Sequence, residues 1–378
     1  MLKTLTAGSL LAALATGALA QEGGVKVGLV STLSGGGAGL GVDVRDGFLL
    51  AVKDRDDVEV VVEDDQQKPD VAVRVAERMI QSEEVDVLTG IIFSNLAMAV
   101  VPSAVNQGIF YLSPNAGPSA LAGERCHENY FNVSWQNDTI HEGAGAYANE
   151  AGYANSFIMA PNYPAGVDAL NGYKRMYEGE VAQEVMTQLG QTDYAAEIAQ
   201  IRASGADSVF FFLPGGMGIS FLKQYADSGV EIPLVGPAFS FDQTILPAVG
   251  DAAEGVVNTA QWSPDLDNAA NVEFVEAFEA EYGRIPSLYA SQGYDTGRLL
   301  LSAMGAADVS DMDAFREALR AADFESTRGD FRFGPNQHPI QDVWAREVYL
   351  NDDGVYTNRA LSVVLEDHSD AYAAECKM

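Results

Sequence analysis

Short apolar runs alternate with longer amphipathic stretches along the first third of the chain. The runs are rich in Val and Ile and are bounded by glycine, proline or charged residues; they lie at 25–30, 58–62, 85–92 and 109–112. Segments of helix length separate them, at 41–54, 70–82 and 95–107. Short buried strands that alternate with helices are typical of a parallel sheet covered by helices on both faces.

The same alternation returns in the middle of the chain. Strands are predicted at 156–160, 179–184, 208–213 and 234–235, and helices at 165–177, 194–203 and 217–228. No repeat of individual residues relates the two regions. We therefore predict an α/β fold with two doubly wound, Rossmann-like lobes joined by a hinge.

The last third of the chain changes from helices to strands. Helices are predicted at 269–282, 289–305 and 312–321, and hairpin-like segments near 331–333 and 344–350. A late helical block can return to the first lobe, and the terminal strands can then return to the second. We expect lobe 1 to comprise 21–138 and 262–328, lobe 2 to comprise 139–261 and 329–365, and a tail at 366–378 to be tied to lobe 1.

The first residues have the features of a secretory signal peptide. Lys3 precedes an apolar run at 10–19, and the stretch ends in Ala18-Leu19-Ala20. An uncleaved membrane anchor is the alternative, although the run is shorter than the roughly 20 apolar residues that span a bilayer. We predict cleavage of residues 1–20 and export of a mature protein to the periplasm.

The net charge of the chain argues against one class of binding partner. The 378 residues include 22 basic and 54 acidic side chains, which give a formal net charge of −32. Nucleic acid is therefore not expected as a partner, because its binding is driven by Lys and Arg. The hydrophobic fraction of 47% is that of a globular protein, and net charge alone does not identify a ligand.

The chain has two cysteines, Cys126 and Cys376. In an oxidising compartment such a pair is expected to form a disulfide, which would close a long loop and pin the polar tail. The alternative is a buried free Cys126 beside a frayed tail. Two cysteines alone cannot build a metal site.

No catalytic, metal or cofactor motif is complete in the sequence. The glycine-rich loop at 35–41 lacks the spacing of a dinucleotide-binding turn, and no lysine follows a glycine as a phosphate-binding loop requires. The four histidines form no zinc motif, and no serine lies in a Gly-x-Ser-x-Gly turn. We predict no cofactor, no metal and no enzymatic activity, which argues against a secreted hydrolase.

Three groups of segments together resemble the type I periplasmic binding proteins of the branched-chain amino acid (Leu/Ile/Val-binding) ABC transporter family. They are VGLVSTLSG at 27–35; DVLTG at 86–90 with YLSPNAG at 111–117; and NYPAG at 162–166 with VGP at 235–237. The resemblance covers nearly the whole mature chain in order. It implies a monomeric two-lobed protein that closes on a small solute and delivers it to a membrane ABC permease.

The resemblance implies a carboxylate anchor in two loops of the first lobe. These loops are Phe93-Ser94-Asn95 and Asn115-Ala116-Gly117, each of which follows a strand and opens a helix. Backbone N–H groups there can receive an anion without Arg or Lys. Gly117 stands where the family usually has Thr, so only its N–H can serve. The alternative role of Ser94 and Asn115 is helix capping.

The resemblance also implies ligand contacts on the other walls of the cleft. Tyr163 and Tyr289 match ligand-facing aromatic positions, whereas Ala238 replaces the glutamate that pairs with the ammonium group of an amino acid. Phe239 and Phe241 place aromatic surface beside the lost charge, or else belong to the core. We therefore expect an aromatic carboxylate of the benzoate or hydroxycinnamate type. A branched-chain amino acid or aliphatic acid is the alternative ligand, and a ligand-sensing receptor subunit is the alternative role.

Overall fold

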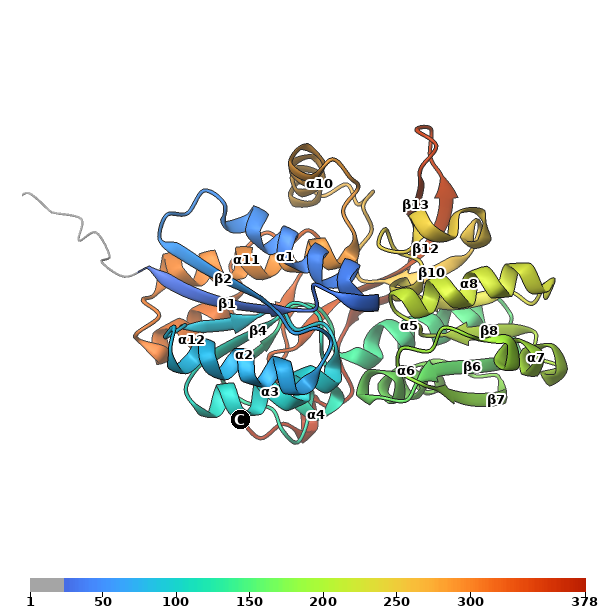
Figure 1. Ribbon diagram of the computed structural model, residues 1–378, viewed down its shortest axis with the longest axis horizontal. Helices are drawn as coiled ribbons and strands as arrows, with labels where there is room; N and C mark the ends of the chain where they lie inside the picture. Colours follow the sequence, from blue (N-terminus) through green and yellow to red (C-terminus); the bar gives the residue numbers. More distant parts are fainter. Residues whose placement is uncertain (1–23) are drawn as a thin grey trace, which may run out of the picture.

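Two α/β lobes lie side by side in the computed structural model of the protein, which describes residues 24–378 (Figure 1). The predicted signal peptide at 1–20 lies outside the described residues. Each lobe is built around a sheet whose parallel strands are joined by helices. The predicted α/β fold class is confirmed, and the predicted residue boundaries of the lobes stay a prediction.

The first sheet is entirely parallel and has the strand order β2-β1-β3-β4-β5. Its strands are β1 Val25–Ser31, β2 Val58–Asp64, β3 Val87–Thr89, β4 Phe110–Ser113 and β5 Tyr130–Asn132. The connections are a 3-10 turn Gly35–Gly37, α1 Ala38–Val52, α2 Pro69–Gln81, α3 Ser94–Asn106 and α4 Ser119–Ala122. Three later helices, α10 Ala269–Tyr282, α11 Leu288–Ala306 and α12 Met312–Ala321, follow in the chain. Figure 1 shows α11 and α12 against the first sheet.

The second sheet has eight strands in the order β11-β12-β10-β9-β8-β6-β7, with β13 paired to β12. Its strands are β6 Asn155–Pro161, β7 Glu180–Thr187, β8 Ser208–Phe211, β9 Leu234–Pro237, β10 Val257–Ala260, β11 Arg332–Phe333, β12 Pro339–Leu350 and β13 Tyr356–His368. The helices are α5 Asn137–Glu150, α6 Pro164–Met176, α7 Ala195–Ser204, α8 Gly216–Ser228 and α9 Leu246–Val249. Short 3-10 turns lie at Ala238–Ser240, Gly250–Ala253 and Ala373–Glu375.

Several elements of the structure were not predicted: the short elements α4, β5, α9 and β10, and the longer α5 and β13. β13 has no counterpart in the prediction, because most of its residues are exposed or only partly buried and its sequence lacks a clear apolar alternation. α5 was also missed: its first nine residues are all buried, so polar and apolar side chains alike face the interior and no amphipathic stripe remains. In contrast, the predicted helices at 41–54, 70–82 and 95–107 are confirmed within three residues.

Glycine allows α1 and α11 to pack backbone against backbone. A Cβ atom added at Gly47 would lie 1.9 Å from the carbonyl oxygen of Ala290, and one added at Gly293 would lie 2.1 Å from that of Val44. Neither contact is possible for a residue with a side chain. This reciprocal approach fixes the N-terminal part of α11, including Tyr289, against the first lobe.

A buried arginine joins the segments that cross between the lobes. Arg328 pairs with Asp295 at 3.0 Å and donates hydrogen bonds to Ser134 O and Gln341 Oε1. Gln341 in turn donates to Ser134 O. Segments far apart in sequence therefore share one buried polar cluster, in which Asp295 offsets the charge of the arginine.

The C-terminal tail is attached to the first lobe near α4. Cys126 and Cys376 form a disulfide across a sequence separation of 250 residues, as predicted. Figure 1 shows the C-terminus close to α3 and α4. The Tyr372 hydroxyl also donates to Asp138 Oδ2 at 2.9 Å, so the tail reaches the start of α5.

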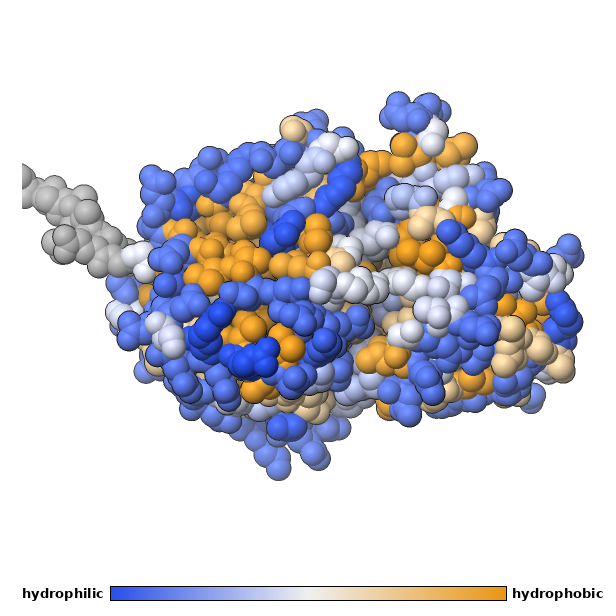
Figure 2. All heavy atoms as spheres, viewed as in Figure 1, coloured by the Kyte–Doolittle hydropathy of each residue, from blue (hydrophilic) through white to orange (hydrophobic). Residues whose placement is uncertain are grey.

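Polar residues dominate the face shown in Figure 2, and a hydrophobic area lies around β2, the edge strand of the first sheet. Within the described residues no helix combines the length and the apolar character that crossing a bilayer requires.

We predict that replacing both cysteines by serine lowers the free energy of unfolding by roughly 2–5 kcal/mol, because the cross-link limits the unfolded chain. Urea denaturation of the oxidised protein and the double variant measures the difference. Quantitative alkylation of both thiols in protein purified without reductant would contradict the bridge.

We also predict that Gly47→Ala destabilises the protein by about 1–3 kcal/mol or more, because the new methyl group overlaps the backbone of α11. Gly305→Ala is the matched control, since Gly305 lies in α11 with open space at its Cβ position. That variant is expected to be neutral or stabilising by up to about 1 kcal/mol. Equal melting temperatures for the two variants would contradict the proposed role of the close approach.

Candidate functional site

A cavity of about 30 Å³ lies between the lobes, at the carboxyl ends of the parallel strands, and the residues that line it are buried. This volume is well below the range for small-molecule sites, so the walls must move apart to admit such a ligand. The first lobe and α11 contribute Leu40, Ile92, Phe93, Ser94, Asn115 and Tyr289. The first crossing segment, α5 and the second lobe contribute Trp135, Asn137, His141, Tyr163, Ala165, Phe212, Pro214 and Phe239.

The N-terminus of α3 forms one wall of this cavity. Phe93 is the extended N-cap residue, and its carbonyl oxygen accepts from the N–H groups of Leu96 and Ala97. The helix donors nearest the cavity are therefore the N–H groups of Ser94 and Asn95, which have no partner within an α-helix. Among the described residues, those that line the cavity include no Lys or Arg.

The Ser94 hydroxyl is oriented by a neighbouring amide. Asn137 Nδ2 donates to Ser94 Oγ at 3.1 Å, and the serine is buried. Because the hydroxyl oxygen accepts this bond, its hydrogen is available to donate toward the cavity. Ser94 can therefore serve a negatively charged group in the cavity.

Asn137, the first residue of α5, is held by partners in both lobes. Its Oδ1 accepts from Gly117 N at 3.1 Å, and its own N–H donates to Gly117 O. Its Nδ2 also donates to Asp168 of α6 at 2.9 Å. Asp168 accepts two further bonds, from the N–H and hydroxyl of Ser119 in α4.

The Asp168 carboxylate thus bridges α6 and α4. Burial raises the pKa of Asp168, and the three hydrogen bonds from Ser119 and Asn137 oppose that shift by stabilising the charged form. The bonds join the second lobe to the first beside the wall that holds Ser94.

The second predicted anchor loop takes a different role from the first. Asn115 lines the cavity, but its Nδ2 donates to Ile92 O at 2.7 Å. Its Oδ1 is buried and has no hydrogen-bond partner in the part of the chain that the structure describes. The Asn115 side chain consequently presents an acceptor to the cavity, whereas a carboxylate needs donors.

Ala116 and Gly117 are not among the residues that line the cavity. The Ala116 carbonyl oxygen accepts from the hydroxyls of Ser113 and Tyr130. The Gly117 N–H is already bound to Asn137, and a Cβ atom at this position would lie 2.0 Å from Trp135 O. Gly117 is therefore required by the tight contact with the crossing segment, and its N–H is not available for a ligand.

Aromatic rings form most of the remaining walls. Tyr163 stacks on Phe212 with ring centroids 6.3 Å apart, and Phe239 packs against Trp135 at 4.7 Å. Tyr289 approaches Phe239 from α11 at 6.4 Å. Burial raises the pKa of the Tyr163 and Tyr289 hydroxyls, so both stay neutral.

Two other predicted positions lie behind this wall. Ala238 is buried and does not line the cavity, although the next residue, Phe239, does. Phe241 packs against Phe211 in the core of the second lobe, at 5.3 Å between ring centroids. For Phe241 the core alternative therefore holds.

His141 adds a polar group to the aromatic side of the cavity. Its ring packs against Phe212, Phe239 and Phe210 at 4.9, 5.6 and 5.8 Å. Burial lowers the pKa of His141 to about 3, which keeps the imidazole neutral. Its Nδ1 is buried without a hydrogen-bond partner among residues 24–378.

The sequence analysis missed Trp135, Asn137 and His141. All three belong to the first crossing segment or to α5, which has no amphipathic stripe. The polar residues just before α5 could have indicated its start. In the structure Gln136 precedes the helix, and its side chain accepts from Asp138 N, as the side chain of an N-cap residue does. A polar cluster directly after a short strand therefore marked the start of α5.

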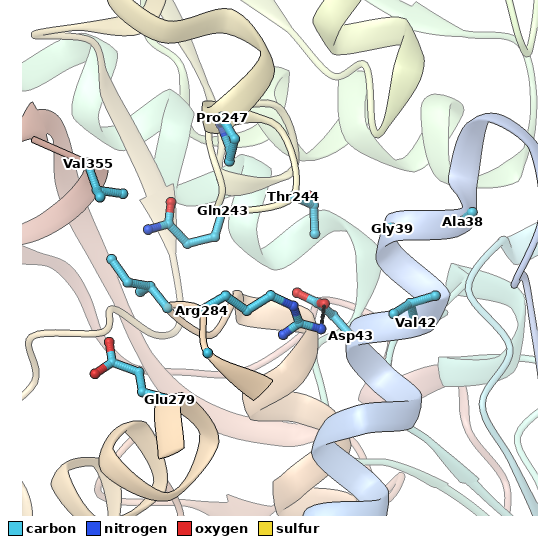
Figure 3. A pocket seen from close by; sticks show the side chains of 12 residues that line it. Ala38, Gly39, Val42, Asp43, Gln243, Thr244, Pro247, Glu279, Arg284 and Val355 are labelled. Carbon is cyan, nitrogen blue, oxygen red and sulfur yellow. Dashed lines mark hydrogen bonds and ion pairs between the residues drawn. The ribbon is translucent and has the colours of Figure 1, made fainter. Parts of the chain in front are cut away.

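A larger and more open pocket of about 770 Å³ lies where α1 approaches the loop after β9 (Figure 3). Arg284 and Asp43 point toward each other there and form an ion pair, and Arg284 also pairs with Asp46. Two carboxylates already offset the one cation, so this pocket is less suited to an anion than the enclosed cavity. No group of three or more His, Cys, Asp or Glu side chains in the described residues is arranged to hold a metal ion.

Comparisons with known proteins agree with this geometry. Residues 24–354 match the family described as periplasmic binding protein. A Leu/Ile/Val-binding protein homolog of Brucella melitensis is 29% identical over 357 residues, which cover 89% of this chain and 90% of that protein.

Solved structures of solute-binding proteins are also similar to this chain. A solute-binding protein of an ABC transporter from R. palustris, in complex with benzoate, is 32% identical with a TM-score of 0.88; the match covers 94% of this chain and 100% of that one. Another from R. palustris, in complex with 4-hydroxybenzoate, is 25% identical with a TM-score of 0.83, covering 91% and 98%. The chain therefore belongs to the periplasmic binding protein family, whose members are solute-binding proteins of ABC transporters rather than enzymes.

Proposed function

We propose that this protein captures a small aromatic carboxylate, of the benzoate or hydroxycinnamate type, and delivers it as a monomer to an ABC permease. The observation that carries the proposal is the enclosed cavity itself. It combines a helix N-terminus and a serine hydroxyl on one wall with aromatic rings on the others.

The hydrogen-bond donors at the start of α3 support the proposal that the ligand carries a carboxylate. The N–H groups at the start of α3 and the Ser94 hydroxyl converge on one wall of the cavity, and a helix N-terminus favours negative charge. This local arrangement lets a protein of net charge −32 bind an anion without a cationic side chain in the cavity.

The aromatic side chains that line the cavity support the proposal that the ligand contains an aromatic ring. Tyr163, Phe212, Phe239 and Tyr289 offer faces and edges on which a flat ring can pack, and such aromatic contacts favour offset or edge-to-face arrangements. The R. palustris relatives, solved with benzoate and with 4-hydroxybenzoate, support the same ligand class.

A branched-chain amino acid is the second candidate ligand. The Brucella homolog favours it, and the free Oδ1 of Asn115 could accept from an ammonium group. Against it, the described residues that line the cavity include no Asp or Glu, and the alanine at 238 supplies no charge. A buried ammonium group would lack an ionic partner, which costs several kcal/mol.

Closure follows from contacts that join the lobes around the ligand. Asp168 of α6 binds Ser119 of α4 and also Asn137, which orients Ser94. A ligand held by both walls favours the closed arrangement because the open one cannot offer all of its contacts.

Calorimetry should show that an aromatic carboxylate binds with micromolar or better affinity, about −8 kcal/mol, whereas leucine and valine bind far more weakly. The physical reason is the absence of a charged partner for their ammonium groups. Tight binding of leucine without any response to benzoates would replace the proposed ligand by the second candidate.

Ser94→Ala should weaken binding of the aromatic carboxylate by about 1.5–3 kcal/mol, the range for a hydrogen bond to a charged group. Ser103→Ala is a matched control, because Ser103 is an exposed serine on the same helix. It should leave the dissociation constant unchanged. Equal affinities for wild type and Ser94→Ala would place the carboxylate elsewhere in the cavity.

A further inference from the structure

The cavity contains a polar group that neither half of the proposed ligand uses. His141 is 1% exposed, lines the cavity and has a buried Nδ1 without a partner in the described part of the chain. An unpaired buried nitrogen costs free energy relative to one that is hydrogen-bonded. Because the residue lines the cavity, an occupant that reaches this nitrogen would supply the missing partner and remove part of that cost.

The backbone of α5 sets the distance between this nitrogen and the carboxylate wall. Asn137, which holds Ser94, and His141 are four residues apart in α5, so they lie on one face of the helix about 6 Å apart along its axis. That spacing is comparable with the span from a ring carboxylate to a substituent on the far side of the ring. A ligand anchored at Ser94 can thus direct such a substituent toward His141.

The surroundings of His141 restrict the chemistry of that substituent. Three phenylalanine rings pack against the imidazole, and burial keeps it neutral. A neutral imidazole nitrogen is a donor in one tautomer and an acceptor in the other, and a hydroxyl can pair with either. A methyl group cannot pair at all, and a second charged group would be buried without a counter-charge.

We infer that His141 is the specificity-determining residue of the cavity and selects aromatic carboxylates with a hydroxyl on the ring opposite the carboxylate. This inference rests on the proposed function, because it takes the carboxylate to lie at Ser94. It assigns the para-hydroxybenzoate class as the preferred ligand over unsubstituted benzoate.

The test compares benzoate, para-hydroxybenzoate and para-methylbenzoate by calorimetry on the full mature protein and on His141→Phe. The variant keeps an aromatic ring in an apolar setting and removes both nitrogens. Wild type should bind the hydroxy compound about tenfold more tightly than the methyl compound, and the variant should lose this preference while still binding benzoate. Phe93→Leu is the control, since Phe93 lines the cavity and its ring packs against Tyr163 rather than His141, so its loss should weaken all three ligands alike.

Nitrogen NMR of labelled imidazole in wild type gives a second readout that needs no variant. The His141 signals should shift with para-hydroxybenzoate and differ from those with para-methylbenzoate. Benzoate binding without preference for the hydroxy compound, or a preference unchanged in His141→Phe, would overturn the role of His141 alone. Failure of all three compounds to bind would overturn the proposed function and this inference together.

Discussion

The hydrogen bonds of Asn137 are the constraint on which the arrangement of the cavity depends. This one amide binds Gly117 in the first lobe, Ser94 at the start of α3 and Asp168 in the second lobe. All of its side-chain partners are buried, so the amide has a single orientation. That orientation decides which atom of Ser94 faces the cavity, and it connects this wall of the cavity with the contact between the lobes.

The electrostatic field inside the cavity has a different origin from the net charge of the protein as a whole. The protein as a whole is strongly acidic, which acts at long range and is screened by salt. Inside the cavity the relevant field comes from a few backbone dipoles at the start of α3 and from the Ser94 hydroxyl. Asp168 lies nearby, but its charge is held by Ser119 and Asn137 rather than directed at the site.

The specificity that we propose for the cavity depends on buried polar atoms without a hydrogen-bond partner as much as on the groups that contact the ligand. Asn115 Oδ1 and His141 Nδ1 are both buried and unpaired in the described residues, and both residues line the cavity. A ligand that leaves them unpaired retains their desolvation cost, whereas a ligand that pairs with one of them removes part of it.

The sequence by itself determined the α/β architecture, most helix positions and the disulfide, because apolar periodicity and the presence of only two cysteines are local or countable properties. It also indicated Phe93, Ser94, Asn115, Tyr163, Phe239 and Tyr289, which all line the cavity. Only the tertiary structure decided that α5 supplies Asn137 and His141, that the Gly117 N–H is already occupied, and that Asn115 presents its oxygen. These outcomes depend on hydrogen bonds between residues 20 or more positions apart, and no local pattern of residue types records which partner a buried polar group will find.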